Sequence, residues 1–93
     1  MKRQERAIDH MDLPAILTCF RCRFPKEMKN LRLISVRQDR WGSPNDLILD
    51  WEYTKRQPHC MKFFTAHITL DPAHNWKPLA PTLCGPMTAP SSG

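Results

Sequence analysis

Proline is the residue that most limits how this chain folds: nine Pro residues are spread from Pro14 to Pro90, with only three Gly. Each Pro lacks a backbone N–H and interrupts a helical hydrogen-bond ladder, which excludes a long-helix bundle and a coiled coil. The 93 residues therefore predict one small domain built from short elements, with a marginal core.

The N-terminal third predicts one helix and one strand. Residues 3–13 place apolar side chains at helical spacing and stop before Pro14, which indicates a short helix. Over residues 15–24, Phe20, Cys22 and Phe24 alternate with basic residues, and Pro25 follows. This alternation is typical of a half-buried strand.

Three further strands are predicted over residues 31–38, 47–54 and 60–70, separated by turn-forming residues. The alternation is clearest in the segment 47–54, where the apolar face carries Leu47, Leu49, Trp51 and Tyr53. The expected fold class is α+β: a short N-terminal helix, a four-stranded antiparallel meander and a Pro-rich irregular C-terminal tail.

A simple hairpin closed by residues 55–59 sets the register of the last two strands. The expected pairs are Thr54 with Cys60, Trp51 with Phe63, Tyr53 with Met61 and Glu52 with Lys62. Aromatic then meets aromatic and acid meets base across the strands.

If the loop 39–46 also closes a simple hairpin, Gln38 pairs with Leu47, Val36 with Leu49 and Ile34 with Trp51. Four apolar residues then fall on the polar face: Leu31, Leu33, Phe64 and Ile68. Either that face is partly covered or the register shifts at a bulge, and the pattern leaves both open.

Composition divides the chain at residue 71. Residues 1–71 are expected to form the domain, and the Pro-rich residues 72–93 an extended or disordered tail. Leu, Ile, Val and Phe make up only 19 of the 93 residues, so a largely disordered chain is a further interpretation.

The net charge of +5 lies entirely within residues 20–40. Seven basic side chains and one adjoining Trp are the candidate binding residues: Arg21, Arg23, Lys26, Lys29, Arg32, Arg37, Arg40 and Trp41. If they form one surface, its cations can neutralise phosphates. Trp41 either is exposed, to stack on bases or to anchor a partner, or folds back over the sheet edge.

The expected function is therefore a small non-enzymatic binding module that contacts nucleic acid mainly through phosphates. The alternative is a protein-interaction or inhibitor module that binds an acidic protein, of the accessory type found in phage or mobile elements. The same basic residues serve both hypotheses, so the sequence does not identify the partner. It also leaves the oligomeric state open.

Other chemistry finds little support in the sequence. Cys19 and Cys22 have zinc-ligand spacing, but the residues left to complete the site are weak candidates: His59 and Cys60 first, then His74 and Cys84. The expectation is no cofactor, with zinc as the alternative. No catalytic triad order or Gly-rich phosphate loop is present. Without an apolar segment of about 18 residues or a signal-peptide pattern, the expectation is a cytoplasmic or nuclear protein that is neither secreted nor membrane-bound.

Overall fold

The computed structural model describes residues 5–55 and 61–88 and shows an α+β fold with an antiparallel sheet, as predicted. The elements in chain order are α1 (Ala7–His10), α2 (Leu13–Arg23), α3 (Pro25–Met28), β1 (Leu31–Gln38), β2 (Asp46–Tyr53), β3 (Met61–Asp71), η1 (Pro72–His74), β4 (Lys77–Pro78) and β5 (Thr82–Thr88). Strand β3 pairs with β2 on one side and with β4 and β5 on the other, so β1 is an edge strand.

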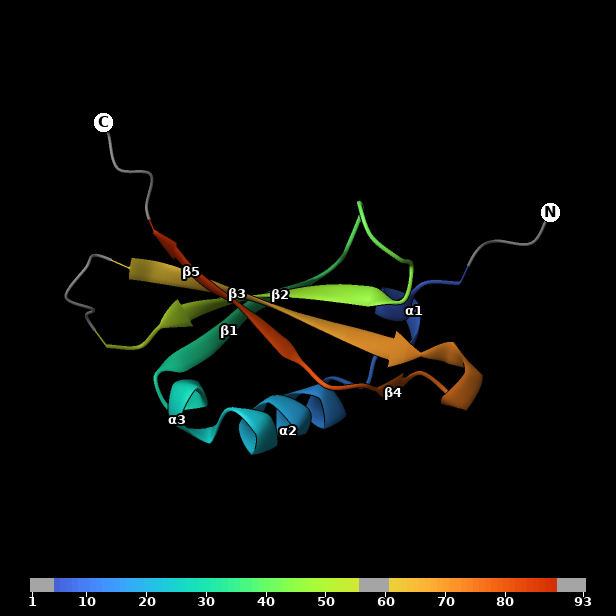
Figure 1. The fold of residues 1–93 in the computed structure, drawn as a ribbon, viewed down its shortest axis with the longest axis horizontal. Coiled ribbons are helices and arrows are strands. Elements are labelled where there is room, and N and C mark those ends of the chain that lie inside the picture. The colour runs from blue at the N-terminus through green and yellow to red at the C-terminus, as the bar shows by residue number, and fades with distance from the viewer. Residues whose placement is uncertain (1–4, 56–60, 89–93) are drawn as a thin grey trace.

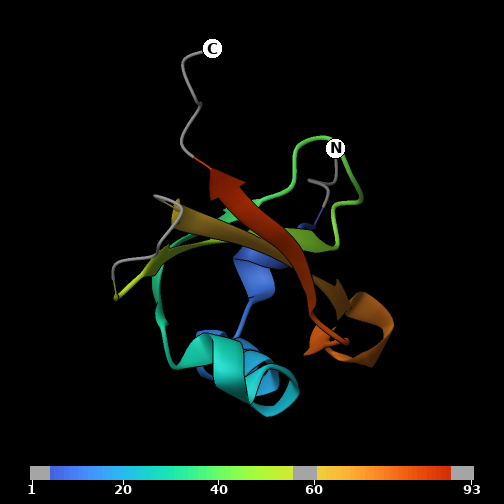
Figure 2. The same ribbon diagram turned by 60° about the vertical axis from the view of Figure 1, so that its left-hand side comes forward.

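The sheet has two unlike faces. Figures 1 and 2 show α2 and α3 packed against one face, while the loop between β1 and β2 extends on the opposite side. The face away from α2 carries the polar residues of the alternating strands, including Arg32, Ser35 and Asp50. This is the usual arrangement of an antiparallel sheet with one solvated face.

The predicted strand over residues 15–24 is wrong, because the segment forms most of helix α2. The Asp12 side chain caps the helix by accepting from the Ala15 N–H at 3.4 Å, and Pro14 lies in the first turn, where proline is tolerated. Ile16 and Phe20, one helical turn apart, are both fully buried, whereas Cys22 is exposed. The helical period therefore decides which side chains reach the core, and the alternation of Phe20, Cys22 and Phe24 does not.

The N-terminal helix is confirmed but is shorter than expected. Helix α1 covers only Ala7–His10, and its first residue, Ala7, is fully buried. The Ala7 N–H donates to the Pro44 carbonyl at 2.8 Å. This bond ties the helix to the loop between β1 and β2.

Strand β1 has the predicted bounds, and its register shifts once. The pairs Gln38 with Leu47 and Val36 with Leu49 are confirmed, but Trp51 pairs with Leu33 and not with Ile34. A β-bulge between Leu33 and Ser35 accommodates Ile34 as an extra residue, half exposed at 50%. Of the two alternatives left open by the sequence, the bulge is the one observed, and it turns Leu31 and Leu33 toward the core.

The predicted register between β2 and β3 is wrong by one residue. Trp51 pairs with Phe64, and Glu52 pairs with Phe63. Phe64 is therefore buried, together with Ala66, Ile68 and Leu70 at alternate positions of β3. Burial of this whole alternating set fixes the register, because a slip of one residue would turn every member to solvent, and the observed register also pairs two aromatic residues. Residues 56–60 of the connecting loop lie outside the described residues.

Part of the predicted tail belongs to the sheet. Asp71 caps η1 by accepting from the Ala73 N–H at 3.0 Å, and β5 then returns along β3. Leu83 pairs with Ala66 and packs against the core. Strand β5 contains Pro86, which an edge strand tolerates. Residues 89–93 of the tail lie outside the described residues.

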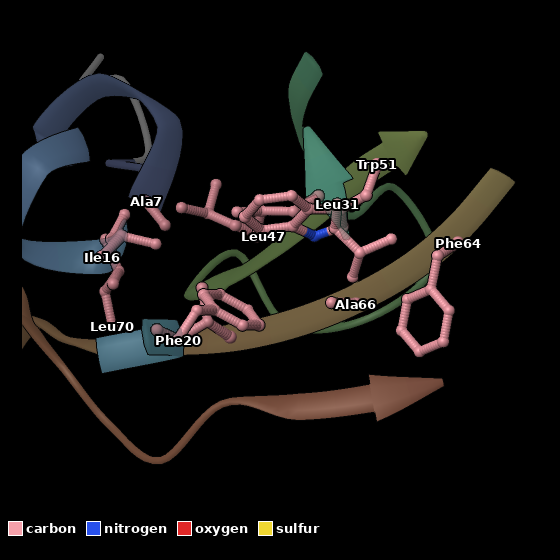
Figure 3. Packing of buried hydrophobic residues seen from close by; sticks show 11 residues of the cluster. Ala7, Ile16, Phe20, Leu31, Leu47, Trp51, Phe64, Ala66 and Leu70 are labelled. Atoms are coloured by element: carbon pink, nitrogen blue, oxygen red, sulfur yellow. The ribbon is translucent and has the colours of Figure 1, made fainter. Parts of the chain in front are cut away.

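The core lies between α2 and the sheet (Figure 3). The Phe20 ring meets the Trp51 indole edge-on, with centroids 5.5 Å apart. The remaining fully or nearly fully buried side chains come mainly from β2 and β3, including Leu47, Leu49 and Ile68. Helix α2 therefore depends on a few large side chains for its attachment to the sheet.

Candidate functional site: a cationic corner and an adjoining groove

The structure distributes the eight predicted binding residues over three places. Arg21 and Arg23 lie on the last turn of α2, and Lys26 and Lys29 lie in and directly after α3. Arg32 and Arg37 lie on β1, and Arg40 and Trp41 lie in the loop between β1 and β2. The loop is on the side of the sheet opposite to α2 and α3 (Figures 1 and 2), so the eight residues do not share one surface.

The two arginines of β1 each contact a carboxylate of β2. Arg32 donates to Glu52, the residue directly opposite it on β2. On the other side of β2, Glu52 is opposite Phe63 and not Lys62 as predicted. Arg37 donates to Asp50 through Nε at 2.8 Å and Nη2 at 3.3 Å, and the Ser35 hydroxyl adds a bond at 2.9 Å. These bonds lower the pKa of the Asp50 carboxyl below its ordinary value and raise the pKa of Arg37. Both guanidinium groups are thus already engaged on the solvated face of the sheet.

The pairing of Asp50 predicts a stability difference that depends on pH. Because the folded-state pKa of Asp50 lies below 3.8, its carboxylate stabilises the fold above that pH and loses this effect as the pH falls through the folded value. Asp50→Asn is therefore expected to be less stable than the native chain at neutral pH, and the difference is expected to be smaller near about pH 2. Urea unfolding at both pH values measures the difference.

A double-mutant cycle tests the physical cause. Arg37→Gln added to Asp50→Asn is expected to change stability little further, because the two side chains act as one pair. A deficit of Asp50→Asn that stays the same at both pH values would contradict the assignment.

Four basic residues form what we call the cationic corner: Arg21, Arg23, Lys26 and Lys29. All four are exposed, and Glu27 is the one acidic residue between the first and the last of them. Within the described residues none of the four makes an ion pair. Cations in the last turn of α2 also interact favourably with the helix dipole, which gives Arg21 and Arg23 a structural role besides any binding role.

Arg21 and Arg23 do not point the same way. Residues two apart on a helix are separated by about 200° of rotation, so the two side chains leave opposite flanks of α2. The sequence placed them on one face of a strand, and the change from strand to helix separates them. Arg21 is on the flank that faces β1, where it lines a groove with Arg32 and Leu33.

This groove, which we call the α2–β1 groove, has a volume of about 330 Å³. Its apolar lining comes from Leu17, Met28, Leu31, Leu33 and Trp51. Sequence reasoning missed the groove because it read α2 as a strand. The Asp12 cap before Pro14 and the turn-long spacing of Ile16 and Phe20 are sequence signals for a helix, but the alternation of Phe20, Cys22 and Phe24 is an equal signal for a strand.

Trp41 is held in an exposed position by its own loop. The Asp39 carboxylate accepts from the Trp41 N–H at 3.0 Å and from the Gly42 N–H at 3.1 Å. A Cβ at Gly42 would lie 2.5 Å from an oxygen of that carboxylate, so any larger residue there would displace the Asp39 side chain from these bonds. The Trp41 side chain is 97% exposed and does not fold back over the sheet edge.

A second hollow of about 450 Å³ lies near α1 and β4, among residues that the sequence did not single out. The His10 ring stacks on Trp76 with centroids 4.7 Å apart and planes within 4°. Trp76 and Asn75 both have a φ of 58°, the left-handed region. Contact with His10 helps to hold this turn in place, a role that residues so distant in sequence do not reveal.

The cysteines show no converging ligand set. Cys19 and Cys22 are one turn apart on α2, and no group of three His, Cys, Asp or Glu side chains suitable for a metal occurs among residues 5–55 and 61–88. His59 and Cys60 lie outside those ranges. Burial raises the pKa of the Cys84 thiol, which reduces its thiolate fraction. The expectation of no cofactor stays a prediction.

Two further findings complete the description. Among the described residues, no helix has the length and apolar character needed to cross a membrane. No protein-family model, no curated protein and no solved structure gives a significant match to this chain.

Proposed function

We propose that the protein is a small non-enzymatic binding module that docks an acidic segment of a partner protein at the cationic corner. The supporting observation is that Arg21, Arg23, Lys26 and Lys29 are exposed and that, in the part of the chain the structure describes, none of them has a carboxylate partner. Unpaired cations of this density attract an acidic partner and accelerate its association.

The distribution of charge favours a protein over nucleic acid. A duplex requires several cations on one surface that follows the phosphates. Here Arg32 and Arg37 are bound to carboxylates, and Arg40 lies on the other side of the sheet. The groove beside Arg21 has a mainly apolar lining, which suits the side chains of a protein better than a phosphate.

Nucleic acid is the second candidate, and the four unpaired cations favour it. If all four contacted phosphates, affinity would fall roughly a hundredfold between about 50 and 200 mM salt. An acidic protein held partly by apolar contacts would lose much less.

The test compares two defined probes at about 150 mM salt, polyglutamate and a 20-base-pair DNA duplex. Polyglutamate is expected to bind and the duplex to bind weakly. The double variant Lys26→Glu with Lys29→Glu turns two attractions into repulsions and is expected to weaken polyglutamate binding roughly tenfold or more.

Arg40→Glu with Lys77→Glu is the matched control, because both residues are exposed and the change in net charge is identical. It is expected to retain most of the binding. Tight duplex binding with no polyglutamate binding would establish the second candidate instead. Failure of both probes would overturn the proposed function.

A further inference from the structure

Strand β1 leaves its outer edge unpaired. It is the terminal strand of the sheet, and of the backbone hydrogen bonds outside the sheet ladders in residues 5–55 and 61–88, none involves residues 31–37. An open strand edge presents N–H and C=O groups at the spacing that another extended chain requires. The edge of β1 is therefore able to pair with one more strand.

The α2–β1 groove runs beside this edge. Leu31 and Leu33 of β1 point into it, and Leu17 and Met28 of the helices form the opposite wall. A strand added to β1 would send every second side chain toward α2, into the groove. The volume of about 330 Å³ is sufficient for one large aliphatic side chain.

The positive charge of Arg21 at the groove favours a ligand with an anionic group. Arg21 lines it and, among the described residues, has no ion pair, whereas the neighbouring Arg32 is bound to Glu52. A carboxylate that faces the groove, two residues from the inserted apolar side chain, would lie on the same face as Arg21. The groove thus combines an apolar pocket with one available guanidinium.

Trp51 provides a second, independent observation. Its side chain lines the groove and is 4% exposed, and its buried indole N–H is the one side-chain polar atom in the described residues that is buried without a partner. In Figure 3 the indole nitrogen is on the side of Leu31, which lines the same groove. A buried donor without an acceptor is costly. A peptide carries a carbonyl oxygen at every residue, so it can relieve this cost where a hydrocarbon cannot.

We infer that the α2–β1 groove binds an extended acidic peptide, which adds to the edge of β1 and places an aliphatic side chain between β1 and α2 and a carboxylate on Arg21. This inference rests on the proposed function and names its binding mode. The bulge at Ile34 limits pairing to the segment from Leu31 to Leu33, so the recognised peptide is short.

Two peptides of identical composition test this mode. In fluorescein-labelled Ser-Glu-Thr-Leu-Thr-Glu-Ser, both Glu and the Leu share one face of a strand. In Ser-Thr-Glu-Leu-Glu-Thr-Ser, they fall on opposite faces. The first is expected to bind about tenfold or more tightly than the second in fluorescence anisotropy, whereas attraction by charge alone would bind both equally.

Arg21→Glu and Arg40→Glu form the matched pair of variants. They carry the same charge change at exposed positions, but Arg21 lines the groove, whereas Arg40 lies outside both the cationic corner and the groove, in the loop between β1 and β2. Arg21→Glu is expected to weaken binding of the first peptide about tenfold or more, and Arg40→Glu less than about threefold. Far-UV circular dichroism confirms that both variants fold.

The indole N–H resonances give a direct readout of location. On peptide saturation the Trp51 resonance is expected to shift, and the resonance of Trp41, on the other side of the sheet, to stay in place. Trp41→Phe and Trp76→Phe assign the signals. Equal affinity for both peptides, equal effects of the two arginine variants, or an unmoved Trp51 resonance would each overturn the groove inference. Polyglutamate binding that depends on Lys26 and Lys29 would then still support the proposed function.

Discussion

Trp51→Ala is expected to lower the free energy of unfolding by about 3–5 kcal/mol, whereas Trp41→Ala is expected to change it by less than about 0.5 kcal/mol. The Trp51 side chain is 4% exposed and the Trp41 side chain 97% exposed. Replacing Trp51 removes buried apolar surface and the edge-on contact with Phe20, and it leaves a cavity between α2 and the sheet. Trp41 makes no such contact, so the two substitutions differ only in what surrounds the side chain.

Urea unfolding followed by far-UV circular dichroism measures both variants. A chain of 93 residues has a total stability of about 5–14 kcal/mol. The loss expected for Trp51→Ala is therefore a large part of the total free energy of unfolding, and this variant is expected to be partly unfolded at 37 °C. Similar losses at Trp41 and Trp51, or a small loss at Trp51, would contradict the described core.

Phe64→Ala is expected to cost about 3–4 kcal/mol and Phe63→Ala less than about 1 kcal/mol, although the two residues are adjacent and identical. Phe64 is 8% exposed and meets Tyr53 edge-on with ring centroids 6.3 Å apart, whereas Phe63 is 45% exposed on the opposite face of β3. The pairing of Trp51 with Phe64 is what places Phe64 in the core.

Chemical denaturation of the two variants reads out the register of β2 against β3. The simple hairpin predicted by the sequence would bury Phe63, so it requires the opposite order of effects. A larger loss for Phe63→Ala would show that the strands pair with that register. Equal losses would indicate that both faces of β3 are covered.

Much of the sheet was predictable from local pattern. The bounds of β1 follow from the turn-forming residues beside it. The apolar face of β2, with Leu47, Leu49 and Trp51, follows from strict alternation, because a strand turns successive side chains to opposite faces. The pairing of Gln38 with Leu47 follows from the loop between them. The register of β3 did not follow, because loop length alone does not say how residues 55–59 close the turn.

The sequence predicted which basic residues belong to the candidate site, but not how they are arranged. Counting charges located the basic residues, and local sequence could not decide whether Arg21 and Arg23 lie together. That depends on whether residues 15–24 are helical, and the Phe and Cys pattern fits a strand as well. The groove beside Arg21 joins residues from α2, β1 and β2, so no local pattern describes it.

By itself the sequence determined the kind of elements this chain uses: short ones separated by proline, an antiparallel sheet with one apolar face, and a basic segment over residues 20–40. Tertiary structure alone decided three things: the helical state of α2, the bulge at Ile34 and the one-residue register of β3. Each was decided by which apolar set is buried together. That choice depends on contacts between residues distant in sequence, and it outweighs the small local preference for helix or strand.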